Sequence, residues 1–292
     1  MKSLDKFKPE KEFFIGIDSD GCVFDTMEVK HKEFFCPNTV KFFGLFAIAK
    51  YVRETWDFVN LYSVTRGINR FPALIMVMDL LAERPEVAER GAVLPDMEPL
   101  RKWVAGETRL GNPVFREYVQ ANPVPSLERV LDWTLAINED IAKWLRDTPP
   151  FPHARKSIEK LGQVADAIVV SQTPLEALAR EWKEHEIDGL VKAIAGQEQG
   201  TKSEHIGQAA TGKYPPEKIL MIGDAPGDLK AANDNGALFF PVIPGDEDKS
   251  WKRFHDEALD RFIEGTYRGE YQDRLIEAFR KSLPEKPAWQ KS

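Results

Sequence analysis

Two aspartates separated by one residue follow the first apolar run of the chain. The run is Phe13-Phe14-Ile15-Gly16-Ile17, and Asp18 and Asp20 come directly after it, ahead of a glycine. In an extended backbone residues i and i+2 point the same way, so we expect both carboxylates to face one pocket. Two carboxylates that lie close repel each other, and a cation is needed to keep both ionised. The spacing therefore predicts a cation-binding pocket at the end of this run.

Four more polar residues stand where they could complete such a pocket. Asp224 and Asp228 follow a later apolar run, Ser171 follows another, and Lys202 stands at the start of an expected helix. If these runs are neighbouring parallel strands, their carboxyl ends converge on one crevice, the usual ligand site of an open α/β sheet. Three or four carboxylates there suit a hard, oxygen-loving ion, of which Mg²⁺ is the natural choice. Lys202 would lie close to a phosphate held by the free backbone N–H groups of its helix.

The apolar runs around these residues predict a parallel sheet. Short runs rich in aromatic and β-branched residues, each ahead of a loop, are typical of buried strands. We expect strands at 13–17, 167–170, 219–222 and 238–240, and a weaker one at 193–195. Between them, capping-box spacing predicts helix starts at Thr173 and Thr201, and 228–235 is a short helix ended by Gly236. Alternating strands and helices indicate an α/β fold.

The segment between the first two strands has a different pattern. Residues 28–149 contain no convincing strand, and 45–59 and 73–81 have helical periodicity. A further helix starting near Ser126 presents one apolar face, made by Leu127, Val130, Leu131, Leu135, Ile141, Trp144 and Leu145. A Pro-rich stretch at 148–152 returns the chain to the α/β half. We therefore predict an all-helical domain inserted after the first strand, with two chain crossings that would let it move as a lid.

The composition excludes several classes of function. The 292 residues include 40 Lys and Arg against 47 Asp and Glu, a net charge of −7, so we expect neither a nucleic-acid nor a membrane partner. The two cysteines, Cys22 and Cys36, cannot form a disulfide framework, and the charged N-terminus lacks the apolar core of a leader. The longest apolar run is too short to span a bilayer. We expect a cytoplasmic protein that ends in a frayed polar tail at 284–292.

Taken in order, the polar motifs resemble those of the haloacid dehalogenase superfamily of phosphohydrolases. The four matching segments are Asp18-Ser19-Asp20-Gly21 within 17–26, Val170-Ser171, Gly200-Thr201-Lys202 and Gly223-Asp224-Ala225-Pro226-Gly227-Asp228. Each motif alone is weak, and the four together in the family's order are a strong signal. The resemblance implies a Rossmann-like three-layer core formed by 1–27 and 150–292, with a helical cap formed by 28–149.

The resemblance also implies a role for each matched residue. Asp18 would attack phosphorus and form an aspartyl-phosphate, while Asp20 would protonate the leaving oxygen and then deprotonate the attacking water. Ser171 and Lys202 would hold the phosphoryl oxygens. The ligands of Mg²⁺ would be the carboxylate of Asp18, the backbone carbonyl of Asp20, Asp224 and, directly or through water, Asp228.

These inferences predict Mg²⁺-dependent hydrolysis of a small phosphate monoester. One alternative is a phosphomutase of the same superfamily, where Asp25-Thr26 also occurs, and another is a non-catalytic binding protein on the same fold. The intact motif residues argue against the binding protein. Substrate choice should lie in the cap, where Arg66 and Arg70 belong to a polar interruption between two helices and could meet an anionic substrate. A solvated loop is the simpler interpretation of these two arginines.

Overall fold

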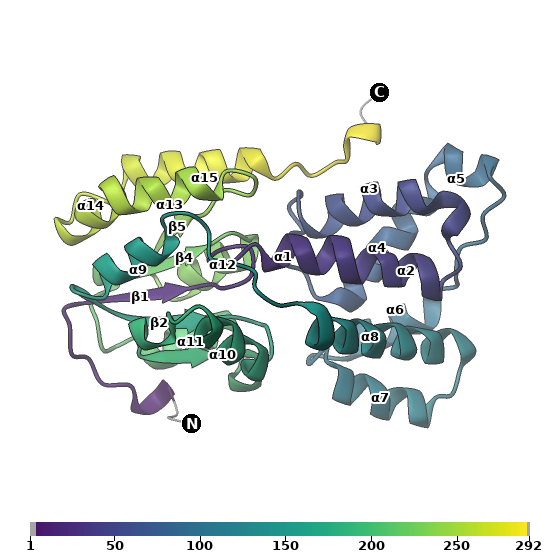
Figure 1. The fold of residues 1–292 in the computed structure, drawn as a ribbon, viewed down its shortest axis with the longest axis horizontal. Coiled ribbons are helices and arrows are strands. Elements are labelled where there is room, and N and C mark those ends of the chain that lie inside the picture. The colour runs from purple at the N-terminus through teal and green to yellow at the C-terminus, as the bar shows by residue number, and fades with distance from the viewer. Residues whose placement is uncertain (1–3, 291–292) are drawn as a thin grey trace. The chain divides into compact units, whose positions relative to one another are not determined.

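The computed structural model describes residues 4–290, and five parallel strands within them form one sheet (Figure 1). The strands are β1 (Phe13–Ile17), β2 (Ala165–Val170), β3 (Ala193–Ala195), β4 (Ile219–Gly223) and β5 (Leu238–Pro241). Their order across the sheet is β3-β2-β1-β4-β5, so β1 lies at the centre between β2 and β4. All five predicted strands are confirmed. Every residue of β1 is buried, as expected for a central strand covered on both faces.

Helices pack on both faces of the sheet, because successive side chains of each strand point to opposite sides. In β1, Phe13, Ile15 and Ile17 enter one core, and Phe14 enters the other. The first core is completed by side chains from α9 (Ala154–Leu161), α10 (Leu175–Glu184), α13 (Glu247–Arg253) and α14 (Leu259–Ile263). The second is completed by α11 (Lys202–Ala209) and α12 (Pro226–Asp234), and α15 (Glu270–Ser282) contributes to both. The predicted three-layer α/β core is confirmed.

The two helix starts predicted from capping-box spacing have different outcomes. Thr201 caps α11 as expected: its hydroxyl accepts from Glu204 N at 3.2 Å, and its N–H donates to Glu204 Oε2 at 2.6 Å. The start predicted at Thr173 is wrong, because α10 begins at Leu175. The backbone N–H of Leu175 donates to the Glu198 carboxylate at 3.0 Å. Glu198 lies far from this helix start in the sequence, so local capping-box spacing could not identify it as the capping group and indicated Thr173 instead.

The described chain divides into two compact units, each with its own core. Unit 1 comprises Met1–Met27 and Arg146–Pro284 and holds the sheet, and unit 2 comprises Glu28–Leu145 and Glu285–Ser292. No strand occurs among the described residues of unit 2, in agreement with the predicted helical cap. Its helices are the end of α1 (Thr26–Val29), a π-helical segment (Lys30–Phe35), α2 (Cys36–Phe42), α3 (Ala49–Asn60), α4 (Arg70–Ala82), α5 (Pro85–Glu89), α6 (Glu98–Gly106), α7 (Asn112–Ala121) and α8 (Pro125–Trp144). Within 4–290, no helix combines the length and apolar character needed to cross a membrane.

Aromatic side chains from three helical segments form the centre of unit 2. The rings of Phe35 and Trp56 lie 6.0 Å apart, and Trp56 lies 6.2 Å from Trp133, whose indole N–H donates to Thr39 Oγ1 at 3.1 Å. The apolar face predicted for α8 is only partly right, because its last residue, Trp144, is 64% exposed while Trp133 is fully buried. Ile141 is the last residue of α8 that packs against this core, so the apolar core ends about one turn before the helix does.

The C-terminal segment packs on unit 2, contrary to the prediction of a frayed tail belonging to the core. The Trp289 ring lies 4.2 Å from the Arg84 guanidinium and 5.8 Å from the Phe58 ring, and Gln290 Nε2 donates to Glu83 Oε2 at 2.7 Å. Apolar and cation–π contacts hold this segment although its composition is polar. The chain therefore passes between the units three times rather than twice. The last two residues of the predicted tail, 291–292, lie outside the described residues.

Candidate active site

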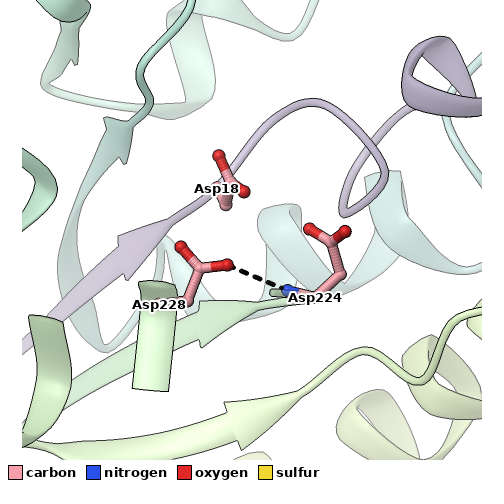
Figure 2. A group of neighbouring side chains, drawn as sticks. All are labelled: Asp18, Asp224 and Asp228. Atoms are coloured by element: carbon pink, nitrogen blue, oxygen red, sulfur yellow. Dashed lines mark hydrogen bonds between the residues drawn. The ribbon is translucent and has the colours of Figure 1, made fainter. Parts of the chain in front are cut away.

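Three buried aspartates meet at the carboxyl ends of two adjacent strands. Asp18 follows β1, Asp224 follows β4, and Asp228 stands in the first turn of α12. Each offers one carboxylate oxygen that lies within 4.8 Å of the other two (Figure 2). The pairing of β1 with β4 fixes this arrangement, since the backbone N–H of Asp18 continues the ladder by donating to Ile222 O at 2.9 Å. The predicted convergence of these three carboxylates is present in the structure.

Lys202 bridges two of the carboxylates. Its Nζ donates to Asp18 Oδ2 at 2.7 Å and to Asp228 Oδ1 at 2.6 Å. Burial alone would lower the pKa of Lys202, but the charges of Asp18 and Asp228 raise it, so the ammonium stays protonated. For Asp18 burial is the largest effect and raises its pKa; Lys202 opposes the rise, and Asp228 and Asp224 add to it. One lysine does not offset three buried carboxylates, so the cluster favours an additional cation.

The position of Asp228 depends on a glycine. Asp228 Oδ2 accepts the backbone N–H groups of Asp224 at 3.2 Å and of Ala225 at 3.0 Å, while its other oxygen binds Lys202. A Cβ on Gly223 would lie 2.3 Å from Asp228 Cγ, so only glycine lets the carboxylate pack over the end of β4. Asp228 is the third residue of α12 and not its N-cap, which is Ala225. One of its oxygens accepts backbone N–H groups at the start of the helix, and the other binds Lys202. Helix α12 also begins two residues earlier than predicted, at Pro226.

A buried tryptophan donates a hydrogen bond to the loop after β1, a contact that the sequence did not predict. Trp182 of α10 is fully buried, and its indole N–H donates to Ser19 Oγ at 3.0 Å. The Ser19 backbone N–H donates to Asp18 Oδ1 at 2.8 Å, and its carbonyl accepts the N–H of Val23 at 2.8 Å. Gly21, with φ of 76°, turns the chain within this loop. The spacing of apolar residues marks Trp182 as a core residue, but not as a partner of a loop 163 residues earlier in the chain.

Asp20 stands apart from the three clustered aspartates. Its Oδ1 accepts from Thr26 Oγ1 at 2.5 Å, and its Oδ2 accepts from Thr173 Oγ1 at 2.6 Å. Two threonine hydroxyls therefore engage the Asp20 carboxylate, and the expectation that it faces one pocket with Asp18 stays a prediction. The structure does not test whether the backbone carbonyl of Asp20 binds a metal, so that role stays a prediction.

Ser171 leaves the sheet at the same edge as Asp18. The register pairs Val169 with Ile17, so β2 and β1 end side by side. Ser171 is buried, its N–H donates to Ala195 O at 3.0 Å, and its hydroxyl accepts the N–H of Thr173 at 3.2 Å. Ser171 therefore lies at the same edge of the sheet as Asp18, and its role in binding a phosphoryl oxygen stays a prediction.

The two arginines suggested for the helical unit have different surroundings. Arg66 is buried, and its Nη1 donates to Leu61 O at 2.7 Å, a contact that closes its own loop. Arg70 begins α4, and its Nη1 donates to Thr134 Oγ1 at 3.0 Å and Asn138 Oδ1 at 2.7 Å. Burial lowers the pKa of Arg70 to about 10, which leaves it charged at neutral pH. Arg66 therefore has a structural contact within its own loop. Arg70 is positively charged, and its guanidinium donates these hydrogen bonds to uncharged groups.

The three buried carboxylates fit a divalent cation of the Mg²⁺ type. All of the candidate ligands are hard oxygen donors, and their mutual repulsion decreases when a cation lies between them. His and Cys ligands, which softer metals prefer, are absent from this group. The chemistry of the donor set therefore agrees with the predicted metal.

Comparison with known proteins gives structural similarity only. Neither a protein-family model nor a curated protein sequence matches the chain. Similar solved structures include a haloacid dehalogenase-like hydrolase from Streptococcus pneumoniae (16% identity, 84% of this chain and 91% of that one, TM-score 0.41). A candidate β-phosphoglucomutase from Bacteroides vulgatus (16%, 89% and 93%, 0.48) and a predicted phosphoglycolate phosphatase from Haemophilus somnus (15%, 80% and 86%, 0.46) are also similar. At these identities the likeness concerns the fold, so the chemistry has to follow from the site itself.

Proposed function

We propose that this chain is a phosphohydrolase that acts on a small phosphate monoester with Mg²⁺ and through an aspartyl-phosphate on Asp18. The observation that carries the proposal is the pairing of Lys202 with Asp18 inside the group formed with Asp224 and Asp228. This arrangement places a nucleophilic carboxylate beside a fixed positive charge. It also leaves Asp20 outside the group, where it can exchange a proton.

The proposed reaction has two steps that use the two aspartates differently. In the first, an oxygen of Asp18 forms a bond to phosphorus, the ester P–O bond breaks, and Asp20 gives its proton to the leaving oxygen. In the second, the Asp20 carboxylate takes a proton from water, the water oxygen bonds to phosphorus, and the bond to Asp18 breaks. Free phosphate and unchanged Asp18 and Asp20 result, so protons balance over the cycle.

Lys202 and the metal would share the charge of the phosphoryl group. The residues that would hold Mg²⁺ are Asp18, Asp224, Asp228 and, through its backbone carbonyl, Asp20. When bound, the ion would neutralise negative charge on the phosphoryl oxygens and screen Asp18 from the other carboxylates. Lys202 would bind a phosphoryl oxygen in place of one carboxylate contact, and the Ser171 hydroxyl would donate to another.

The substrate and the compartment are also parts of the proposal. We infer a small phosphorylated metabolite, with Arg70 rather than Arg66 as the first candidate to bind an anionic group on it, because a loop carbonyl already engages Arg66. The cytoplasm remains the proposed compartment, since Cys22 and Cys36 are both unbridged.

A hydrolysis screen of sugar, nucleotide and organic-acid phosphates with Mg²⁺ tests this function. The wild type should release phosphate from at least one substrate, and Asp18→Asn should not. Brief reaction with the best substrate, followed by acid quenching and mass spectrometry, should find a phosphoryl group on Asp18 in the wild type. Isomerised sugar phosphate without free phosphate would favour the mutase. Mg²⁺ binding without turnover of any substrate would favour a binding protein.

A further inference from the structure

Both carboxylate oxygens of Asp20 accept a hydrogen bond from a threonine hydroxyl. The donors are Thr26, at 2.5 Å, and Thr173, at 2.6 Å. Two donors on separate oxygens fix the plane of a carboxyl group, because rotation about the Cβ–Cγ bond would break both bonds. Thr173 lies 153 residues from Asp20 in the sequence, so this contact joins the loop after β2 to the loop after β1.

The backbone of Thr173 is itself fixed by neighbouring segments. Its N–H donates to Ser171 Oγ at 3.2 Å, and its carbonyl accepts the N–H of Gln197 at 3.1 Å. The backbone at Gly196 packs closely against Thr173, because a Cβ on Gly196 would lie only 2.9 Å from the Thr173 carbonyl oxygen. The ends of β2 and β3 therefore determine where the Thr173 hydroxyl lies.

The hydroxyl of Thr173 does not cap the helix that follows it, although the local sequence favours that role. A threonine at this place before a helix ordinarily caps the first turn. Here Glu198 binds the N–H of Leu175 instead, and Thr173 Oγ1 donates to Asp20. Thr26 differs, because it begins α1 within two residues of the passage between the units. Thr173 is thus the partner of Asp20 that the sheet of unit 1 holds in place.

We propose that Thr173 is a positioning residue that orients the Asp20 carboxyl group for proton transfer, an inference that rests on the proposed phosphohydrolase function. The oxygen of a protonated carboxyl group can accept from a hydroxyl while its own proton goes to the substrate. Thr173 would keep that proton directed at the leaving oxygen when the ester bond breaks. Without the hydroxyl, Asp20 remains present but loses the Thr173 contact that helps to set its orientation.

The dependence of the rate on the leaving group distinguishes this role from a general structural one. An alkoxide leaving group needs a proton from Asp20, whereas 2,4-dinitrophenolate is stable enough to leave without one. Thr173→Val keeps the shape and removes the hydroxyl, and Thr173→Ser keeps the hydroxyl. Thr266→Val, at an exposed turn of unit 1, is the matched control.

The kcat/KM for alkyl and aryl phosphates should be measured for all four proteins, with Mg²⁺ affinity and melting temperature. This ratio covers only the steps up to departure of the leaving group, so the later role of Asp20 toward water does not enter it. Thr173→Val should lower kcat/KM for an alkyl phosphate about 10–100-fold and for 2,4-dinitrophenyl phosphate less than about threefold, with Mg²⁺ affinity unchanged. Thr173→Ser should stay within about threefold of the wild type for both substrates. Thr266→Val should match the wild type throughout.

Three outcomes would overturn the proposal: equal losses for both leaving groups, failure of serine to restore the rate, or full activity of the valine variant. A wild type that hydrolyses neither ester and forms no aspartyl-phosphate would instead refute the proposed function, and this inference with it. The Asp18→Asn variant separates the two cases, because its loss should be the same for every leaving group.

Discussion

Two groups of buried charged residues, one in each unit, have opposite surroundings. In unit 1 three carboxylates from separate segments lie within 4.8 Å of one another, and one lysine bridges two of them. In unit 2 the buried Arg84 pairs with Glu54 at 2.6 Å, and its guanidinium lies 4.7 Å from the Tyr51 ring. Burying like charges together costs stability, whereas a paired arginine between rings adds to it. The contrast supports the proposal that the three carboxylates bind a cation, whereas Arg84 contributes to packing.

The largest expected effect is on the turnover of Asp18→Asn. The substitution keeps the size of the side chain and removes the nucleophile, so activity in the phosphate-release assay should fall by about 10³-fold or more. The protein should remain folded, because the change removes one of three mutually repelling carboxylates. Retention of even about a tenth of the wild-type rate would contradict the assignment of Asp18.

Metal removal is the next test of the carboxylate group. Exhaustive EDTA treatment should abolish activity, and Asp224→Ala should weaken Mg²⁺ binding at least about 100-fold in calorimetry while changing substrate binding less. In the wild type Mg²⁺ should raise the melting temperature, and this rise should be absent in Asp224→Ala. Arg84→Ala is the control in unit 2: it should lower stability and leave the response to Mg²⁺ intact. Full activity after EDTA would refute the metal.

Substitution of Arg66 and Arg70 tests whether any polar residue of unit 2 binds the substrate. Arg70→Ala should raise KM about 10-fold for an anionic substrate with little change in kcat, since a charge-assisted hydrogen bond contributes about 1.5–3 kcal/mol. Arg66→Ala should mainly lower the melting temperature, because its Nη1 closes the loop through Leu61 O. An unchanged KM in Arg70→Ala would mean that neither arginine binds the substrate, and unit 2 would then have no proposed substrate-binding residue.

The smallest effect is expected from the C-terminal segment. Trp289→Ala should lower the free energy of unfolding by about 1–2 kcal/mol, because it removes ring contacts with Arg84 and Phe58. Hydrogen exchange should become faster at 285–290, while the strands of unit 1 keep their protection. Equal exchange in the variant and the wild type would mean that these contacts do not hold the segment.

Local sequence patterns predicted the strands and most helices correctly, but they did not predict which distant residues contact one another. All five strands and the cap at Thr201 followed from periodicity and spacing, because both depend on residues close in the sequence. The cap at Thr173 failed because Glu198 competes for the same helix start, and the tail prediction failed because Trp289 finds its partners in unit 2. The face of α8 was misjudged at Trp144, since helical periodicity does not say where the neighbouring helices end.

The sequence by itself determined the α/β class, the helical insert and the residues that gather at the site. Strand periodicity and the ends of the apolar runs placed Asp18, Ser171 and Asp224 at strand ends, and parallel strands bring such ends together. Only the tertiary structure decided that Lys202 binds both Asp18 and Asp228, and that Thr173 donates to Asp20. These contacts join residues between 26 and 184 positions apart, and their geometry depends on strand order and register, which no local pattern encodes.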